Sequence, residues 1–256
     1  MKPVNPYGCW TLFVREVRRF LRVNMQTVVA PALTAVLYVI VFRYAMGDRQ
    51  VPGLPVNYFT FLIPGLVMMS MLQNAFANTS SSIMTGKVMN VHIYLLMAPL
   101  SAIETVAAFL LAAVVRAVIV GLVLLLVLYP FADLHLAHLW MILLYGVCGS
   151  LIMGAMGLIG GMWSKKFDDM ALLSNFVILP LTFLSGVFYS VQQLPALWQH
   201  INTFNPFFYL IDGFRFGFLG VGDTDPATAA GIVIAATVVS MLLCWRLWYI
   251  GWKLKE

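Results

Sequence analysis

The chain has 256 residues, of which 62% are hydrophobic and only 10% are charged, with a formal net charge of +5. Its mean hydropathy is +0.91. So few polar residues cannot cover the surface of a soluble globule of this length, which excludes a soluble globular protein. The three cysteines, Cys9, Cys148 and Cys244, lie far apart and have no metal-ligand spacing. The composition therefore predicts a membrane protein.

Residues 7–23 predict a basic amphipathic helix. Apolar side chains and arginines alternate there at helical spacing, and the stretch lacks the apolar core and small-residue cleavage site of a signal peptide. A helix of this kind lies flat on an anionic leaflet. Its apolar residues are Trp10, Phe13, Val14, Val17, Phe20 and Leu21, and its basic residues are Arg15, Arg18, Arg19 and Arg22.

Six later stretches are apolar enough to cross a bilayer, which needs roughly 20 residues of helix. Polar or proline-containing segments separate them, such as GDRQVPGLP and SKKFDD. The sequence therefore predicts an all-α polytopic membrane protein that forms one transmembrane domain over residues 1–256. The expected spans are residues 28–45, 58–78, 102–129, 139–162, 170–190 and 227–249.

Lysines and arginines gather on one side of this topology. An even number of spans places both termini on the same side, and basic residues near span ends are retained in the cytoplasm. We therefore expect both termini in the cytoplasm, together with the connection at residues 85–101. The inner side then holds Lys2, Arg15, Arg18, Arg19, Arg22, Lys87, Lys165, Lys166, Arg246, Lys253 and Lys255, and the outer side holds Arg43, Arg49 and Arg215.

No constellation of residues predicts a catalytic, metal or cofactor site. His135 and His138 are three apart but have no third ligand nearby, so we interpret them as interfacial histidines. FLSGVF, residues 183–188, lies within a predicted span and is interpreted as a close-packing site between helices. Gly86-Lys87 lacks the upstream glycine and the following hydroxyl of a P-loop. We therefore expect no enzyme, and no nucleic-acid partner.

Arg116 is the one charge near the middle of a predicted span. An arginine inside the membrane usually marks a pathway or a subunit seam, and the alternative is a pairing or carbonyl-capping role within the protein. Glu104 lies ~18 Å away along a straight helix, too far to be its partner within that helix. The sequence leaves both interpretations open.

Stretches over nearly the whole chain resemble one family, the ABC-2 type permeases of ATP-binding cassette exporters. They include REVRRFLR, LLMAPLS, SKKFDDM, LPLTFLSGVFYS and FNPFFYLIDGFRFGFLG. The resemblance implies a permease subunit in the bacterial cytoplasmic membrane. Two copies would form the pathway, and two copies of a separate ATPase would drive export. Substrates in the family range from lipid-linked polysaccharides to amphipathic drugs.

The resemblance also implies a role for residues 85–98. In this family the cytoplasmic segment between the second and third spans contains a coupling helix that docks into a groove on the ATPase, and an amphipathic helix suits such a groove. NVHIY stands here where the family usually has acidic residues. The alternative is a segment that lies on the lipid surface. The expected coupling residues are Lys87, Val91, Tyr94, Leu95, Leu96 and Met97.

Residues 192–220 predict two short helices that enter the outer leaflet and return. Prolines and glycines interrupt the stretch, and neither half reaches the length of a span. Its aromatic side chains would form either an interfacial belt or an outer gate that touches substrate. Asp212 and Arg215, three residues apart, are expected to pair. The pathway or gate candidates are Arg116, Trp198, Phe207, Phe208, Tyr209, Phe214 and Arg215.

The rival hypothesis is a self-contained carrier or channel. Such a protein would place several ionisable residues at the membrane midplane and would often contain an internal repeat. The sequence shows no convincing repeat. An exporter subunit for a lipid-linked glycan, a lipid or an amphipathic compound is therefore the leading hypothesis.

Overall fold

The computed structural model describes residues 5–23, 25–47, 50–51, 56–132 and 134–254. Helices make up most of this part of the chain, and its one β pairing is an isolated bridge between Gln50 and Asn57. The predicted all-α fold class is confirmed.

Within the described residues, six helices are long and apolar enough to cross a membrane, as predicted. A π-helical turn precedes α2, and another joins α7 to α8 so that these two helices form one span. The bounds are Ala30–Met46 for α2, Tyr58–Val88 for α3, Ala102–Leu128 for α5, Leu139–Trp163 for α6, Phe167–Leu173 for α7, Leu179–Leu184 for α8 and Pro226–Ile250 for α11.

Two spans differ in length from the prediction. α3 continues to Val88 rather than ending at residue 78, because buried hydroxyl groups in its polar second half bond to backbone carbonyls. Thr79 Oγ1, for example, donates to the carbonyl of Gly154 on α6 at 2.8 Å. The fifth span ends at Leu184 rather than at residue 190. Gly186 follows with φ of +77°, so FLSGVF closes a helix instead of packing inside one.

Side-chain caps explain where several helices begin. Ser101 and Glu104 form a capping box at the start of α5, and the Glu104 carboxylate also accepts the backbone N–H of Asn5, which precedes α1. Asp225 caps α11 by accepting the Thr228 backbone N–H at 2.9 Å. Hydrogen bonds from the Thr228 backbone and hydroxyl hold the pKa of Asp225 below its usual range, so the cap is ionised at neutral pH.

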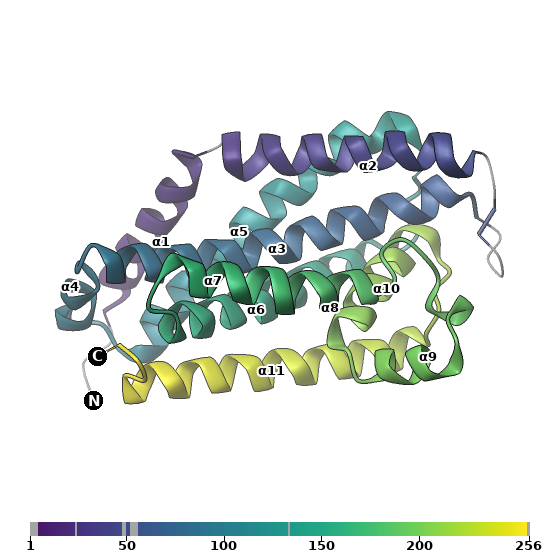
Figure 1. Cartoon of the computed structure of the whole chain (residues 1–256). Helices are drawn as coiled ribbons and strands as arrows, with labels where there is room; N and C mark the ends of the chain where they lie inside the picture. Colours follow the sequence, from purple (N-terminus) through teal and green to yellow (C-terminus); the bar gives the residue numbers. More distant parts are fainter. Residues whose placement is uncertain (1–4, 24, 48–49, 52–55, 133, 255–256) are drawn as a thin grey trace.

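α3 lies at the centre of the bundle, with α6 packed along it (Figure 1). The two backbones come unusually close at Gly157 of α6. A Cβ atom at that position would lie 2.2 Å from Thr79 Oγ1 and 2.4 Å from the carbonyl oxygen of Phe76. Only glycine fits there, as is common where small residues let membrane helices approach.

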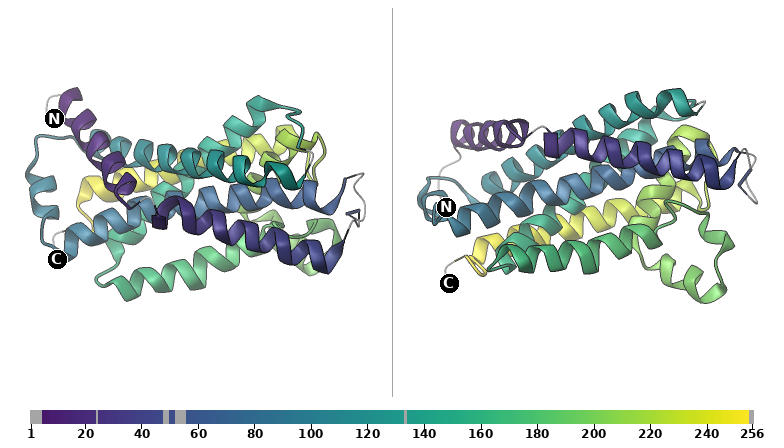
Figure 2. Two further views of the ribbon diagram at one scale, coloured as in Figure 1. Left: turned by 90° about the horizontal axis from the view of Figure 1, so that it is seen from above. Right: turned by 45° about the horizontal axis from the view of Figure 1, so that its top comes forward.

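The shorter helices lie at the two ends of the bundle. α1 (Pro6–Leu21) and α4 (His92–Met97) lie at one end, here the α4 end. α9 (Ala196–Thr203) and α10 (Pro206–Leu219) lie at the other, the α9 end (Figures 1 and 2). α9 and α10 occupy the stretch predicted to hold two short helices. Their entry into the outer leaflet stays a prediction, as does contact of α1 with a leaflet.

Three basic residues that the sequence assigned to a side of the membrane, Lys2, Arg49 and Lys255, lie outside the described residues.

Candidate functional site

α4 presents an apolar face to the outside of the molecule. The side chains of Tyr94 and Met97 are 73% and 75% exposed, and those of Val91 and Ile93 are about half exposed. Apolar groups this exposed on a short helix at the end of a bundle favour a docking role. Three of the predicted coupling residues, Val91, Tyr94 and Met97, are thus exposed at this end of the bundle, as is Ile93, and their contact with an ATPase stays a prediction.

Leu95 and Leu96 point the other way. Both are partly buried and pack against the core cluster at the α4 end, which includes Leu12 of α1 and Phe109 of α5. The sequence predicted that they dock on a partner, and the structure gives them the task of fixing α4 to the bundle. Contact of these two leucines with a partner stays a prediction.

Lys87 belongs to the last turn of α3 rather than to α4. Its ammonium group donates to the carbonyl oxygens of Met162 at 2.6 Å and Ser164 at 2.8 Å. These carbonyls lie at the C-terminus of α6, where a cation is favourable because of the helix dipole. The contact explains Lys87 as a link between α3 and α6.

Arg116 lies beside a cavity of about 640 Å³ bordered by α2, α3 and α5, which we call the α2 cavity. The residue is 8% exposed, and its Nε and Nη2 donate to Asn74 Oδ1 of α3 at 3.2 and 3.0 Å. Its partner is thus a neutral amide rather than a carboxylate. Glu104, the acid on the same helix, is occupied by the capping box.

The predicted gate residues of α10 are buried in the core. Phe207, Phe208, Tyr209 and Phe214 are all less than one-tenth exposed and pack in the main hydrophobic cluster with residues of α3 and α6. A belt side chain must meet lipid, which these four do not in this conformation, and their role as an outer gate stays a prediction. Trp198 of α9 remains exposed and stays a candidate.

Asp212 and Arg215 do not pair with each other, in contrast to the prediction. The Asp212 carboxylate accepts the backbone N–H groups of Asp223 and Thr224, both at 2.9 Å, and so holds the loop before α11. Arg215, only 2% exposed, donates to the carbonyl of Gly186 at 2.7 Å, and its guanidinium stacks on a ring of α3. Each side chain ties α10 to a different segment.

Glu16 of α1 is a buried acid that the sequence interpretation overlooked. Its side chain is fully buried, with Arg15 Nη2 at 2.9 Å and Arg19 Nε at 3.0 Å. Arg19 also donates to the carbonyl of Asn78 on α3 at 2.6 Å. The spacing of Glu16 and Arg19, three residues apart, was the available signal. These contacts fix α1 against the bundle.

Comparison with known proteins adds the family. The family model described as "ABC-2 type transporter" matches residues 7–219. The chain is 36% identical to the inner membrane transport permease YadH of Escherichia coli K12 over 238 residues, 93% of each chain. It is 30% identical to nodulation protein J of Rhizobium leguminosarum bv. viciae over 108 residues, 41% of this chain and 42% of that protein. This chain belongs to the ABC-2 type transporter family and is a membrane permease subunit.

Proposed function

We propose that this chain is the membrane half of an exporter in the bacterial inner membrane. Two copies form the pathway, and a separate ATPase that docks on α4 supplies the energy. The substrate is a lipid-linked glycan, a lipid or another amphipathic compound. The observation behind the proposal is the exposed apolar face of α4, formed by Val91, Ile93, Tyr94 and Met97.

The anchoring of α4 supports docking rather than loose contact with lipid. Leu95 and Leu96 hold the helix on the bundle, while Tyr94 and Met97 stay outside. A helix fixed on one side transmits a push to the elements beneath it.

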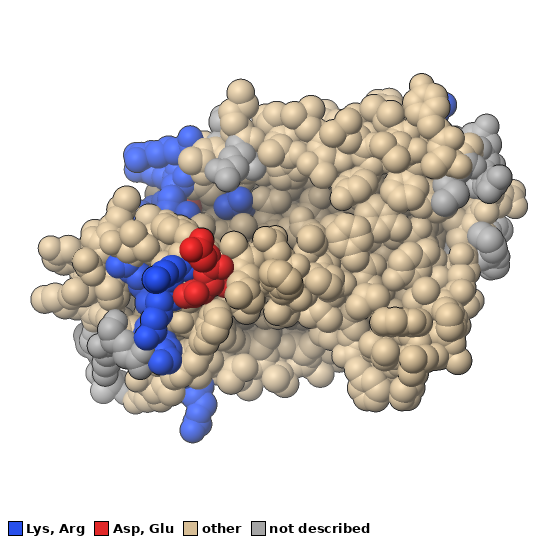
Figure 3. Space-filling view, viewed as in Figure 1, with Lys and Arg blue, Asp and Glu red and all other residues tan. Residues whose placement is uncertain are grey.

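The distribution of charge supports a cytoplasmic position for the α4 end. Figure 3 shows lysine and arginine side chains gathered at that end of the visible face, whereas the rest of the face is mostly uncharged. Basic residues near span ends are retained in the cytoplasm. The first helix, α1, and the last turn of the last helix, α11, both lie at the α4 end, which supports cytoplasmic termini.

The α2 cavity supports the use of two copies. It opens to the face of the molecule beneath α2, where Figure 3 shows a hollow, and Leu179 of α8 borders it. One copy therefore leaves the cavity open on one side. A second copy that faced it would complete an enclosed pathway.

Site-specific cross-linking in cells tests the docking surface. We expect a photoreactive amino acid at Tyr94 or Met97 to cross-link to an ATPase that contains a P-loop. The same residue placed at Leu136, which is exposed in the loop at the α9 end, should not do so. Cross-links from both α4 positions to lipid alone would favour the lipid-surface alternative.

The captured ATPase then allows a functional test. We expect Tyr94→Asp to abolish stimulation of ATP hydrolysis by the purified permease, because a charge would enter the buried interface unpaired. Unchanged copurification and unchanged hydrolysis with Tyr94→Asp and Met97→Asp would contradict the proposal.

A further inference from the structure

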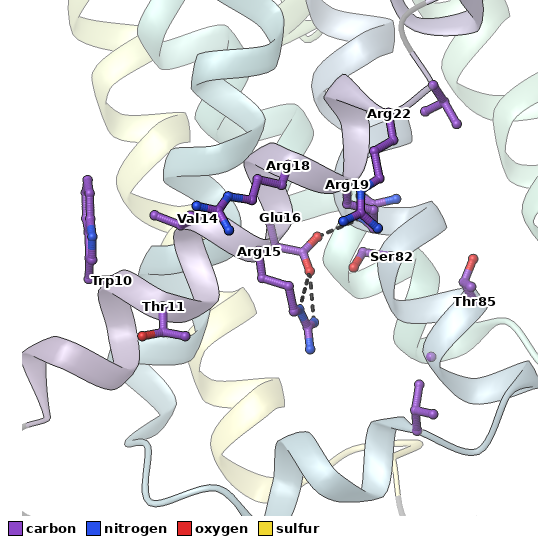
Figure 4. Close-up of a pocket in the computed structure, with 13 residues that line it drawn as sticks. Trp10, Thr11, Val14, Arg15, Glu16, Arg18, Arg19, Arg22, Ser82 and Thr85 are labelled. Atoms are coloured by element: carbon purple, nitrogen blue, oxygen red, sulfur yellow. Dashed lines mark hydrogen bonds and ion pairs between the residues drawn. The ribbon is translucent and has the colours of Figure 1, made fainter.

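A cavity of about 810 Å³ lies between α1, the last turns of α3 and Val91 ahead of α4. We call it the α1 cavity. Figure 4 shows the arginines of α1 around it, with Glu16 among them. The arginines are Arg15, Arg18, Arg19 and Arg22.

Two of these arginines are not neutralised by any described residue. The buried Glu16 carboxylate is shared between Arg15 and Arg19. The guanidinium groups of Arg18 and Arg22 have no ion-pair or hydrogen-bond partner among the described residues, and both residues are exposed. They are four residues apart on one helical face, so their charges repel each other. An anion placed between them would relieve that repulsion.

The α3 side of the same cavity supplies hydroxyl groups. Ser82 and Thr85 line it opposite the arginines (Figure 4). Guanidinium and hydroxyl groups that line one cavity can together bind the several oxygens of a phosphate, and guanidinium binds phosphate with two parallel hydrogen bonds. The α1 cavity is therefore suited to a phosphate-type group.

Arg19 lines both the α1 cavity and the α2 cavity, so the two adjoin. In the α2 cavity Arg116 has the amide of Asn74 as its partner, and no aspartate or glutamate is among the described residues that line this cavity. A buried guanidinium with only a neutral partner is unfavourable at membrane depth. An anion in the α2 cavity would give this guanidinium a charged partner.

Apolar side chains form the remaining wall of the α2 cavity. Leu66 and Met69 of α3 and Leu179 of α8 lie along it. A ligand bound in these cavities would therefore place its headgroup among the arginines and its tail against the apolar side chains. That combination describes an anionic amphiphile rather than a soluble anion.

We propose that the α1 and α2 cavities form one binding site for an amphiphile with a phosphate-type headgroup. Arg18 and Arg22 receive the headgroup at the α4 end, and Arg116 binds it at a second position inside the membrane. The inference rests on the proposed function, whose substrate class it narrows, but its test needs no ATPase.

The test uses the purified full-length permease in neutral detergent, with binding followed by native mass spectrometry and by the shift in melting temperature. The probe is dioctanoyl phosphatidic acid. Dioctanoylglycerol supplies the tail without the phosphate, and inorganic phosphate supplies the anion without the tail. We expect phosphatidic acid to bind at least tenfold more tightly than either.

Variants locate the site. The double change Arg18→Gln and Arg22→Gln should weaken phosphatidic acid binding about tenfold or more, since each charged hydrogen bond contributes about that factor. Arg116→Gln should weaken it similarly, and Arg116→Lys should restore part of the affinity. Arg246→Gln is the matched control, because Arg246 is exposed near the end of α11 and lines neither cavity.

Each other outcome contradicts a defined part of the proposal. If dioctanoylglycerol bound as tightly as phosphatidic acid, the site would not recognise the phosphate headgroup. If inorganic phosphate bound as tightly, the site would not recognise the tail. An Arg116→Gln permease that melts like the parent and binds like Arg246→Gln would remove the second position. If α4 failed to cross-link to an ATPase while phosphatidic acid still bound, only the proposed function would fall. If α4 cross-linked to an ATPase and phosphatidic acid did not bind, the result would contradict only the proposed binding site.

Discussion

Arg215 is expected to hold the α9 end of the bundle together. It lies on α10 and donates to the carbonyl of Phe61 on α3 at 3.1 Å. It also donates to the carbonyls of Gly186 and Val187, which follow α8, at 2.7 and 3.4 Å. Its guanidinium lies 3.6 Å from the centre of the Phe61 ring. Arg215→Met keeps much of the side chain's length but removes every donor.

The cost of this change follows from the carbonyl groups left behind. The Phe61 carbonyl keeps the hydrogen bond expected within α3, but Gly186 and Val187 lie outside any helix and lose their donor. A hydrogen bond to a charged group contributes about 1.5–3 kcal/mol, and two of the three bonds of Arg215 have ordinary lengths. After contacts regained by methionine, the loss is ~3 kcal/mol. In a chain of this size that lowers the melting temperature by about 6–12 °C.

The assay is the apparent melting temperature of the purified chain, read from tryptophan fluorescence. Arg43→Met is the matched control, because Arg43 is exposed near the same end of the bundle and its guanidinium lies 6.0 Å from the Phe59 ring. It should cost less than ~0.5 kcal/mol. Arg215→Lys should fall between the two, since one ammonium group cannot reach all three carbonyls. If Arg215→Met melted within error of Arg43→Met, the structural role of Arg215 would be refuted.

Two further predictions concern packing and topology. Gly157→Ala should lower the melting temperature, because the new Cβ would lie 2.4 Å from the Phe76 carbonyl oxygen. Gly231→Ala is the control and should be neutral or stabilising, because no atom lies within 4 Å of its new Cβ. Equal effects of the two changes on the melting temperature would contradict the close contact at Gly157. In a chain without its native cysteines, a cysteine at Asp168 should resist a membrane-impermeant maleimide in intact cells, and one at His135 should react. Labelling at both positions, or at Asp168 alone, would overturn the six-span orientation.

The spans could be predicted because hydrocarbon thickness sets their length, but α3 shows where that reasoning stops. Its second half contains Asn78, Thr79 and Ser80, which lower the hydropathy and suggested an earlier end. In the fold all three are fully buried, and Ser80 Oγ donates to the carbonyl of Phe76 at 2.7 Å. A hydroxyl satisfied within its own helix does not need water. A hydropathy scale gives the residue the same polar value whether or not its hydroxyl is hydrogen-bonded within the helix.

The partners of the buried charges could not be predicted. Arg215 binds backbone carbonyls on α3 and after α8, and a carbonyl has no signature in a sequence. The i, i+3 spacing with Asp212 was a real local signal, but tertiary contacts replaced it. The burial of the α10 aromatics could not be predicted for the same reason, because it depends on the residues of α3 and α6 that pack with them in the main hydrophobic cluster.

α3 connects the regions discussed above without a break. Phe61, near one end, accepts from Arg215; Asn74, in the middle, accepts from Arg116; and Val88, at the other end, leads into α4. Thirteen residues of helix place Phe61 and Asn74 ~20 Å apart, beyond the range at which two stability effects usually interact. The costs of Arg215→Met and Arg116→Gln in melting temperature should therefore add. If docking on α4 drives transport, we expect transport to depend on α3 as a whole, since one rigid helix would pass a displacement of α4 to both contacts. Additive effects on stability combined with non-additive effects on transport would then indicate that α3 moves as a unit.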